Sequence, residues 1–256
     1  MADVQALRRE VCALHAELPR NGLVVWTSGN VSARVPGEEL MVIKASGVPY
    51  AELTPAAIVV CDLEGAPVED GLAPSSDAET HAFVYRGMPG VGGIAHTHSP
   101  YATAWAARGE PIPCVLTAMA DEFGGEIPLA PFAPIGGDEI GQEIVATLTG
   151  HRSPAVLLQG HGVFALGATA RDAVKAVVMC EDAARTVHLA RALGAVEPLA
   201  PSRIDALYHR YQTVYGQHVV VEALHDPEQP DAGPGARGAR GRPERLDLGH
   251  VAQRCP

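Results

Sequence analysis

The sequence has few cysteines, few aromatic residues and no excess of positive charge. Its five cysteines are widely spaced and form no Cys-x-x-Cys pair, which indicates free thiols in a reducing cytosol rather than a disulfide framework. Aromatic residues make up only 5% of the chain, so the core must consist mainly of alanine, valine, leucine and isoleucine. The formal net charge of −11 argues against nucleic acid or an anionic membrane as a partner, and leaves room only for a local basic pocket.

Long apolar runs are also absent from the sequence. No stretch approaches the roughly 18 apolar residues of a membrane span, and residues 1–11 lack the apolar segment of a secretion signal. We therefore expect a cytoplasmic protein. The chain is 256 residues long, with 47% hydrophobic and 19% charged residues, which is typical of a globular protein with a substantial core.

Helical and strand-like patterns alternate along the chain and predict an α/β fold with one structured domain. Helices are expected at 3–18, 76–85, 100–108, 140–148, 170–193 and 202–215. Strands are expected at 23–26, 31–35, 40–43, 58–62, 93–95, 114–117, 155–158 and 163–166. We place the catalytic domain at 1–222 and predict that the Gly/Pro/Arg-rich segment 223–256 is a disordered tail.

Three histidines are candidates for a metal site. His96 and His98 follow the predicted strand at 93–95, and residues two apart on a strand point to the same side. His161 lies between two glycines in a break between two predicted strands, where its ring can reach a metal without crowding. Three imidazoles with positions left open are typical of a catalytic zinc site. Taken alone, the His-x-His pair also fits two surface histidines at a strand end.

Three polar segments are candidates for binding an anion. The turns 27–30 and 44–47 contain Gly and small polar residues, whose backbone N–H groups can approach a phosphate closely. Ser76 precedes Glu79 by three residues, which predicts a capping box at the start of a helix with Asp77 in its first turn. A helix N-terminus favours negative charge. Plain hairpin turns and simple capping explain the same patterns without a ligand.

Several of these segments together resemble one known family. The motifs TSGNVSAR, KASGV, SSDAETH, AHTHSPYATAWA, GHGVFALG and the later VYGQ occur in this order over residues 5–217. They are similar to those of the zinc-dependent class II aldolases, a family that includes fuculose-phosphate aldolase and L-ribulose-5-phosphate 4-epimerase. The pattern is most similar to the epimerase, because Asp77 replaces the glutamate of the aldolases and Asp121 is present.

The resemblance implies a fold, a metal and a set of site residues. The fold would be a single α/β domain in which helices flank a central, mainly antiparallel sheet. One Zn²⁺ per subunit would bind His96, His98, His161 and also Asp77. The phosphate of a sugar substrate would bind Asn30, Lys44, Ser46, Gly47, Ser75 and Ser76.

The resemblance also implies a reaction and an assembly. Such an enzyme would interconvert L-ribulose 5-phosphate and D-xylulose 5-phosphate, a step of arabinose catabolism, by breaking and re-forming the C3–C4 bond. Proton transfer on the two faces of the substrate would be carried out by Asp121 and Tyr215. Tyr215 would come from a neighbouring subunit of a homotetramer, with active sites at the subunit interfaces.

Some positions depart from the epimerase pattern and keep alternatives open. Ser28 and Ala45 stand where the epimerase typically has Trp and Pro, and Glu122-Phe123 replaces an aromatic pair. The first alternative is a class II aldolase that cleaves a sugar 1-phosphate such as L-fuculose 1-phosphate. The second is a metal-free binding relative such as the adducin head. Such a relative would lack the three histidines, and all three are present in this sequence, which argues against it.

Overall fold

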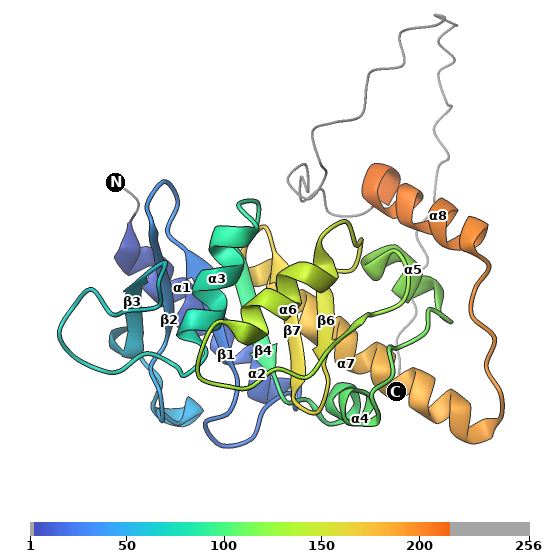
Figure 1. Cartoon of the computed structure of the whole chain (residues 1–256), viewed down its shortest axis with the longest axis horizontal. Helices are drawn as coiled ribbons and strands as arrows, with labels where there is room; N and C mark the ends of the chain where they lie inside the picture. The colour runs from blue at the N-terminus through green and yellow to red at the C-terminus, as the bar shows by residue number, and fades with distance from the viewer. Residues whose placement is uncertain (1–2, 216–256) are drawn as a thin grey trace, which may run out of the picture. The chain divides into compact units, whose positions relative to one another are not determined.

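The computed structural model describes residues 3–215, in which helices and strands alternate (Figure 1). The helices are α1 (Val4–His15), α2 (Glu17–Arg20), α3 (Ala78–Gly87), α4 (Pro100–Arg108), α5 (Thr117–Phe123), α6 (Glu139–Leu148), α7 (Ala170–Leu193) and α8 (Pro201–Arg210), with 3-10 turns η1 (Tyr50–Glu52) and η2 (Pro55–Ala57) and the π-helical segment η3 (Tyr211–Tyr215). The strands are β1 (Asn30–Arg34), β2 (Leu40–Lys44), β3 (Ile58–Asp62), β4 (Gly93–Thr97), β5 (Leu129–Ala130), β6 (Ala155–Leu158) and β7 (Gly162–Gly167). The predicted domain boundary at 222 and the predicted tail 223–256 lie outside the described residues.

The strands form one sheet in the order β3-β2-β1-β4-β7-β6-β5. Every neighbouring pair is antiparallel except β5 and β6, which run parallel. The prediction of an α/β domain with a mainly antiparallel central sheet is therefore confirmed. Strand β4, which carries His96 and is followed by His98, lies in the middle of the sheet between β1 and β7.

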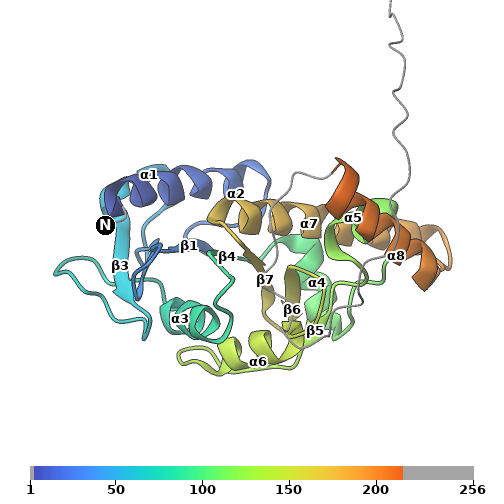
Figure 2. The same cartoon turned by 90° about the horizontal axis from the view of Figure 1, so that it is seen from above.

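Helices cover both faces of the sheet (Figure 2). Helices α1 and α7 pack on one face and α3 and α6 on the other, each layer with its own buried apolar cluster. The alternation of side chains along each strand produces this division. On β2, Val42 belongs to the α1/α7 cluster, whereas Met41 and Ile43 belong to the α3/α6 cluster. Such burial on both faces fixes the strand register, since a shift of one residue would exchange the two sets.

Two predicted strands are wrong. Residues 23–26 do not pair with the sheet, because the Ser28 hydroxyl accepts from the Val25 N–H at 3.1 Å and donates to the Val25 carbonyl at 2.7 Å. This local turn uses backbone groups that a strand ladder would need. Residues 114–116 are irregular and Thr117 begins α5: Leu116 is the N-cap of α5, and the Cys114 carbonyl accepts from the Leu199 N–H at 2.8 Å.

The first helix and two short elements also differ from the prediction. The predicted helix 3–18 is interrupted at Ala16, after which the short helix α2 begins and includes Pro19. Proline is tolerated there because the first turn of a helix has no internal acceptor for its N–H. Helix α5 and strand β5 were not predicted, since neither is long enough to show a clear hydrophobic period. The predicted helix 202–215 is divided into α8, which ends at Arg210, and the π-helical η3. The other predicted elements are confirmed, with ends that shift by one or two residues.

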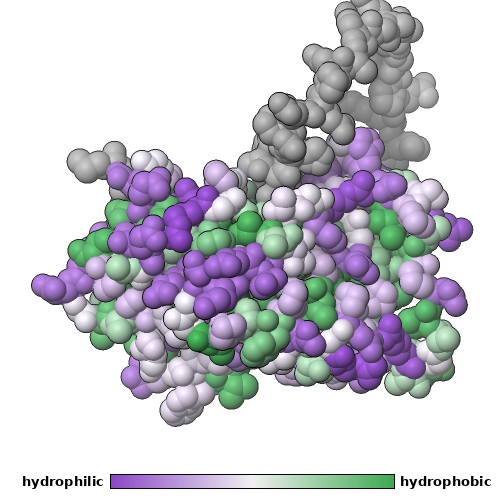
Figure 3. All heavy atoms as spheres, in the orientation of Figure 1, coloured by the Kyte–Doolittle hydropathy of each residue, from purple (hydrophilic) through white to green (hydrophobic). Residues whose placement is uncertain are grey.

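The surface is mixed in polarity. On the face shown in Figure 3, hydrophilic side chains gather over the middle, where α3 and α6 lie, and hydrophobic residues are interspersed around them. Within residues 3–215, no helix combines the length and apolar character that crossing a membrane requires.

Candidate active site

A cavity of about 240 Å³ opens at the end of β4 where the His-x-His pair lies. Its walls come from the turn that precedes β1, the turn that follows β2, the loop that precedes α3 and the loop between β6 and β7. It is lined by all of the residues predicted to bind metal or phosphate, namely Asn30, Lys44, Ser46, Gly47, Ser75, Ser76, Asp77, His96, His98 and His161. Segments that are far apart in the sequence thus meet in one pocket.

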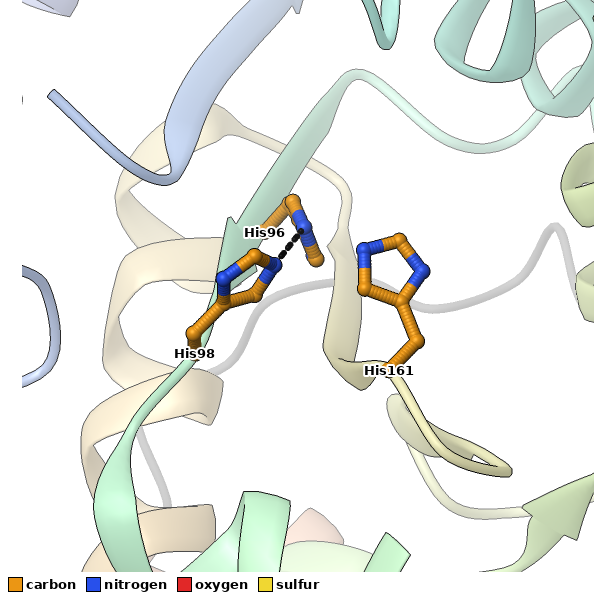
Figure 4. Close-up of side chains that lie close together, drawn as sticks. All are labelled: His96, His98 and His161. Carbon is orange, nitrogen blue, oxygen red and sulfur yellow. Dashed lines mark hydrogen bonds between the residues drawn. The ribbon is translucent and has the colours of Figure 1, made fainter. Parts of the chain in front are cut away.

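The three predicted imidazoles face one another in this pocket (Figure 4). One ligand nitrogen from each ring lies within 4.8 Å of the others, and Nε2 of His96 is 3.0 Å from Nε2 of His98. In a tetrahedral zinc site with bonds of about 2.0 Å, ligand nitrogens are about 3.3 Å apart. The spacing of His96 and His98 is therefore close to that of two ligands of one metal ion.

The protonation of His96 is fixed by the sheet. Its Nδ1 lies 2.9 Å from the carbonyl oxygen of Val163, which can only accept, so Nδ1 carries the proton and Nε2 keeps its lone pair. Burial lowers the pKa of His96 to about 3, so the ring is neutral at physiological pH. Phe164, the cross-strand partner of His96, stacks on the imidazole with ring centroids 4.0 Å apart. These contacts aim a neutral nitrogen into the pocket.

His98 and His161 complete the group with less burial. A Cβ atom at Gly162 would lie 2.8 Å from the His98 ring and 2.6 Å from the Thr97 carbonyl, so only glycine allows the two loops to approach. Nδ1 of His161 is buried and has no hydrogen-bond partner among the described residues. An unpartnered buried nitrogen beside two other imidazoles fits a metal ligand. The group fits a divalent metal that prefers nitrogen ligands.

Asp77 lies in the same pocket but outside the three-imidazole group. Its Oδ2 accepts from Nδ2 of Asn30 at 2.6 Å, and the same Nδ2 donates to the Ser75 hydroxyl at 3.0 Å. Burial disfavours its charge, but the imidazoles of His96 and His81 and the bond from Asn30 outweigh this and lower the pKa of Asp77. Asp77 is therefore an ionised carboxylate next to the histidines.

The predicted capping box at the start of α3 is not formed. Asp77 is the N-cap residue and makes no side-chain capping bond, while the Asp77 N–H donates to the Ser75 hydroxyl at 3.3 Å. The carboxylate is held by Asn30 instead of the helix. The Ser76 side chain is exposed and lines the pocket, where it is available to a ligand.

Lys44 carries an unbalanced positive charge into the pocket. It is only 2% exposed, and among residues 3–215 no carboxylate pairs with it. Its Nζ donates to the carbonyls of Thr27 and Ala45, each at 3.3 Å, and lies 5.5 Å from the centre of the Tyr50 ring. Burial lowers the pKa of Lys44. A buried ammonium without a counter-ion favours an anionic ligand.

The turn 44–47 and the segment that precedes α3 offer fewer backbone donors than expected. The Ser46 N–H donates to the Ala73 carbonyl and the Ser75 N–H to the Lys44 carbonyl, each at 2.9 Å. Gly47 adopts a φ of 71°, and a Cβ atom there would meet nothing within 4 Å, so its backbone faces open space in the pocket. The hydroxyls of Ser46 and Ser76 and the backbone of Gly47 are thus the groups best placed for an anion.

Of the two predicted acid–base residues, the structure describes the side chain of Asp121 alone. Asp121 lies on α5 and is not among the pocket-lining residues, and Tyr215 ends η3. The side chain of Tyr215 is outside the description. Helix α5 is joined to α7 and η3 by Glu122, whose Oε2 lies 2.7 Å from Lys175 Nζ and accepts from the Tyr211 hydroxyl at 3.2 Å.

Other residues of the site were missed from the sequence. The roles of Phe164, Tyr50 and His15 depend on contacts with residues far away in the chain. Phe164 had one usable signal, since it is the second residue after Gly162 and faces the same side of the sheet as His96. Ile135, which also lines the pocket, lies in a loop without any pattern.

A comparison with protein-family models shows the family of the chain. The model of the Class II Aldolase and Adducin N-terminal domain matches residues 9–188, which include the cavity and the three histidines. The chain belongs to this family. The resemblance found in the sequence is thereby confirmed.

Relatives and solved structures of the family agree with this result. The chain is 40% identical over 229 residues to L-ribulose-5-phosphate 4-epimerase UlaF of Salmonella paratyphi C (strain RKS4594), covering 84% of this chain and 100% of that protein. The UlaF protein of Salmonella choleraesuis (strain SC-B67) gives the same values. Among solved structures, an L-fuculose 1-phosphate aldolase has a TM-score of 0.76 and 28% identity, covering 81% of this chain and 96% of its own. The L-fuculose-1-phosphate aldolase of Thermus thermophilus has a TM-score of 0.64 and 25% identity, covering 77% and 98%.

Proposed function

We propose that the protein is a metal-dependent L-ribulose-5-phosphate 4-epimerase. The observation that carries the proposal is one pocket that contains three converging imidazoles and the buried, unpaired ammonium group of Lys44. The first feature suits a metal that polarises a carbonyl group, and the second suits a phosphate. The relatives named as 4-epimerases, at 40% identity over most of the chain, support this substrate.

The reaction would break and re-form one carbon–carbon bond. A base removes the proton of the C4 hydroxyl, and the electrons of the C3–C4 bond move onto the C2 carbonyl to leave an enediolate. The other fragment is an aldehyde that carries the phosphate. Rotation of this aldehyde and addition to its other face, with return of a proton, gives D-xylulose 5-phosphate.

We assign the metal to His96, His98 and His161, with Asp77 as a further ligand, and take it to be one Zn²⁺ per subunit. A bound zinc ion would act as a Lewis acid for the ketone and stabilise the charge that develops on its oxygen. The residues themselves prepare this site: the Val163 carbonyl fixes the His96 tautomer, and Asn30 orients the Asp77 carboxylate.

The phosphate would bind in the same pocket, around Lys44. Lys44 supplies charge, and Ser46, Gly47, Ser75 and Ser76 supply donors. Asn30 belongs to this group by its position, but both hydrogens of its Nδ2 are used by Ser75 and Asp77. Its amide therefore reaches a phosphate only after exchanging one of these bonds.

Asp121 and Tyr215 would be the acid and base that act on the two faces of the substrate. Asp121 does not line the pocket, so we infer that it acts on a neighbouring subunit. We assign Tyr215 to a neighbouring subunit as well, as the resemblance implies, in a homotetramer with active sites at the subunit interfaces. Exposed apolar side chains near the pocket suit such an interface: Ile135, which lines it, is 63% exposed. We place the enzyme in the cytoplasm, in agreement with four free cysteines among residues 3–215.

The second candidate is an aldolase that cleaves a sugar 1-phosphate. The structural similarity to L-fuculose 1-phosphate aldolase favours it, since aldolase and epimerase chemistry share the same bond-breaking step. Asp77 and Asp121 favour the epimerase, as the sequence resemblance implies. The two activities differ in whether the aldehyde leaves the site.

A coupled assay separates the two candidates. The zinc-loaded protein is incubated with L-ribulose 5-phosphate, and D-xylulose 5-phosphate is measured; a parallel reaction with L-fuculose 1-phosphate is monitored for dihydroxyacetone phosphate. We expect turnover of the first substrate and little or none of the second. Turnover of L-fuculose 1-phosphate alone would replace the epimerase by the aldolase, and no turnover of either would reject both.

A further inference from the structure

We propose that His15 and Tyr50 are positioning residues that hold Asn30 from its two sides and thereby orient the Asp77 carboxylate. Neither residue lines the pocket. His15 contacts the backbone of Val31, which follows Asn30, and Tyr50 contacts the backbone of Ser28 and Gly29, which precede it. The inference rests on the proposed function for its kinetic consequence. Its geometric part concerns the turn at residues 25–29, which we call the entry turn.

His15 holds the residue after Asn30. Its Nδ1 lies 2.7 Å from the Val11 carbonyl and its Nε2 2.9 Å from the Val31 N–H. The carbonyl can only accept and the N–H can only donate, so the ring must carry its proton on Nδ1. His15 is fully buried, and both of its nitrogens are satisfied. It therefore connects α1 to the first residues of β1 with one defined tautomer.

Tyr50 holds the residues before Asn30. Its hydroxyl lies 2.8 Å from the Ser28 carbonyl and 3.1 Å from the Gly29 carbonyl, both of which accept from it. The face of the same ring lies 5.5 Å from Lys44 Nζ, and Lys44 in turn donates to the Thr27 carbonyl. One tyrosine thus fixes the entry turn and the lysine next to it.

The entry turn needs such anchors. Trp26 has a φ of 59°, the one positive φ at a non-glycine residue among residues 3–215, and its side chain is 80% exposed. A bulky residue seldom adopts this conformation, which persists where neighbouring contacts hold it. At Gly29 the turn also has no spare room, because a Cβ atom there would lie 2.8 Å from the His96 carbonyl.

Asn30 transmits this arrangement to the site. Its side chain is 2% exposed and donates to Asp77 and Ser75, so a shift of the Asn30 backbone moves the carboxylate beside the histidines. Displacements of about 1 Å in an active site can reduce a rate by about 10². His15 and Tyr50 also contact each other, with ring centroids 6.2 Å apart, so both anchors belong to one cluster behind the site.

The first test measures the turn directly. The sequence contains two tryptophans, so a Trp105→Phe background leaves Trp26 as the only fluorescent indole, within the entry turn. We expect Tyr50→Phe in this background to lower the steady-state anisotropy of Trp26 and to increase its quenching by acrylamide. Unchanged values would overturn the geometric part of the proposal, whatever reaction the protein catalyses.

The second test measures the consequence for turnover of L-ribulose 5-phosphate. Tyr50→Phe and His15→Leu should each reduce kcat/KM by about tenfold or more. His15→Gln, whose amide can both donate and accept, should recover part of this loss. Ser153→Ala is the matched control: it removes a 2% exposed hydroxyl bonded to the Ala155 backbone at 2.7 Å, at the end of β6 remote from the pocket, and should lower Tm without changing kcat/KM.

A double-mutant cycle shows whether Tyr50 acts through Asn30. If it does, Tyr50→Phe adds little to the loss caused by Asn30→Ala, because the side chain that Tyr50 positions is already gone. If the losses of kcat/KM in the two single variants add up in the double variant, Tyr50 does not act through Asn30. If Tyr50→Phe changes only Tm, as expected for Ser153→Ala, Tyr50 is a packing residue. An inactive wild-type protein would instead contradict the proposed function, and the anisotropy result would still stand.

Discussion

Asn30 of β1 and His96 of β4 are direct partners in the antiparallel ladder. Cross-strand partners point to the same face of a sheet, so the amide that holds Asp77 and the most buried of the three pocket imidazoles lie next to each other. On the other side of His96, Phe164 of β7 is its partner and stacks on the ring. Three adjacent strands thus set the position of one ligand nitrogen. This nitrogen is therefore held in the middle of the sheet.

The metal prediction concerns the three imidazoles. Purified protein should contain about one zinc per chain, and His96→Ala or His161→Ala should lose it, since each removes a ligand from a group of three. His209→Ala, which changes an exposed histidine of α8, is the control and should keep the zinc. Metal content is measured by plasma mass spectrometry. Full zinc in either site variant would remove that histidine from the metal site.

The phosphate prediction concerns Lys44 and has two independent readouts, substrate binding and stability. Lys44→Met removes an unpaired buried charge, so KM for the sugar phosphate should rise by about 10-fold to 100-fold while Tm rises by about 2–4 °C. Lys175→Met is the control for stability, because it breaks the pair with Glu122 and should lower Tm. A higher Tm with an unchanged KM would mean that the phosphate binds elsewhere.

The serine pair tests the same subsite without changing charge. The Ser75→Ala, Ser76→Ala double variant should raise KM for the sugar phosphate and leave the zinc content unchanged, because both hydroxyls line the pocket outside the imidazole group. The single variants separate the two roles. Ser75 also accepts bonds from Asn30 and Asp77, so its loss should lower kcat as well, whereas the loss of Ser76 should affect KM alone.

The group of three imidazoles was predictable from the sequence because local spacing brings its members together. His96 and His98 share a face through the two-residue period of a strand, and Gly162 gives His161 its access. The arrangement at Asp77 was not predictable in this way. Ser76 and Glu79 carry the signature of a capping box, but a bond from Asn30, 47 positions away, holds the neighbouring carboxylate instead. Tertiary contacts override local signals where a site is built.

The same distinction applies to the fold. Helix α7 agrees with its predicted range because its apolar pattern extends over 24 residues. Strand β3 agrees because four of its five residues are buried. Residues 23–26 have an apolar, β-branched sequence, yet Val25 and Trp26 are 76% and 80% exposed. These two side chains are apolar but not buried, so an apolar sequence does not predict a strand here. The Ser28 hydroxyl also bonds the Val25 backbone, which gives these residues an alternative to pairing with the sheet.

His15 makes stability depend on pH in the mildly acidic range. Burial lowers the pKa of His15 to about 4 in the folded state, from 6.5 in the unfolded state. The unfolded chain therefore binds the proton first, and the free energy of unfolding falls as pH decreases from 6.5 to 4, by roughly 3 kcal/mol at the lower limit. Above pH 6.5 the contribution is fully present. Denaturant titrations of wild type and His15→Gln at pH 7.5 and 4.5 measure it: the difference in unfolding free energy between the two pH values should be smaller in the variant, and an equal difference would contradict the assignment.

Tyr215 provides the sharpest test of the proposed reaction. Tyr215→Phe removes only a hydroxyl, so folding and zinc content should survive, while epimerisation should fall by about 10²–10⁴, the usual effect of losing a positioned acid or base. Tyr208→Phe, one helix earlier, is the control and should retain activity. If Tyr215 serves a neighbouring subunit, mixing inactive Tyr215→Phe chains with inactive His96→Ala chains should restore activity, because some interfaces then pair an intact metal site with an intact tyrosine. Subunit exchange is verified by native mass spectrometry of chains with different tags. Exchange without recovery would place Tyr215 in the site of its own chain, or outside catalysis if Tyr215→Phe is itself active.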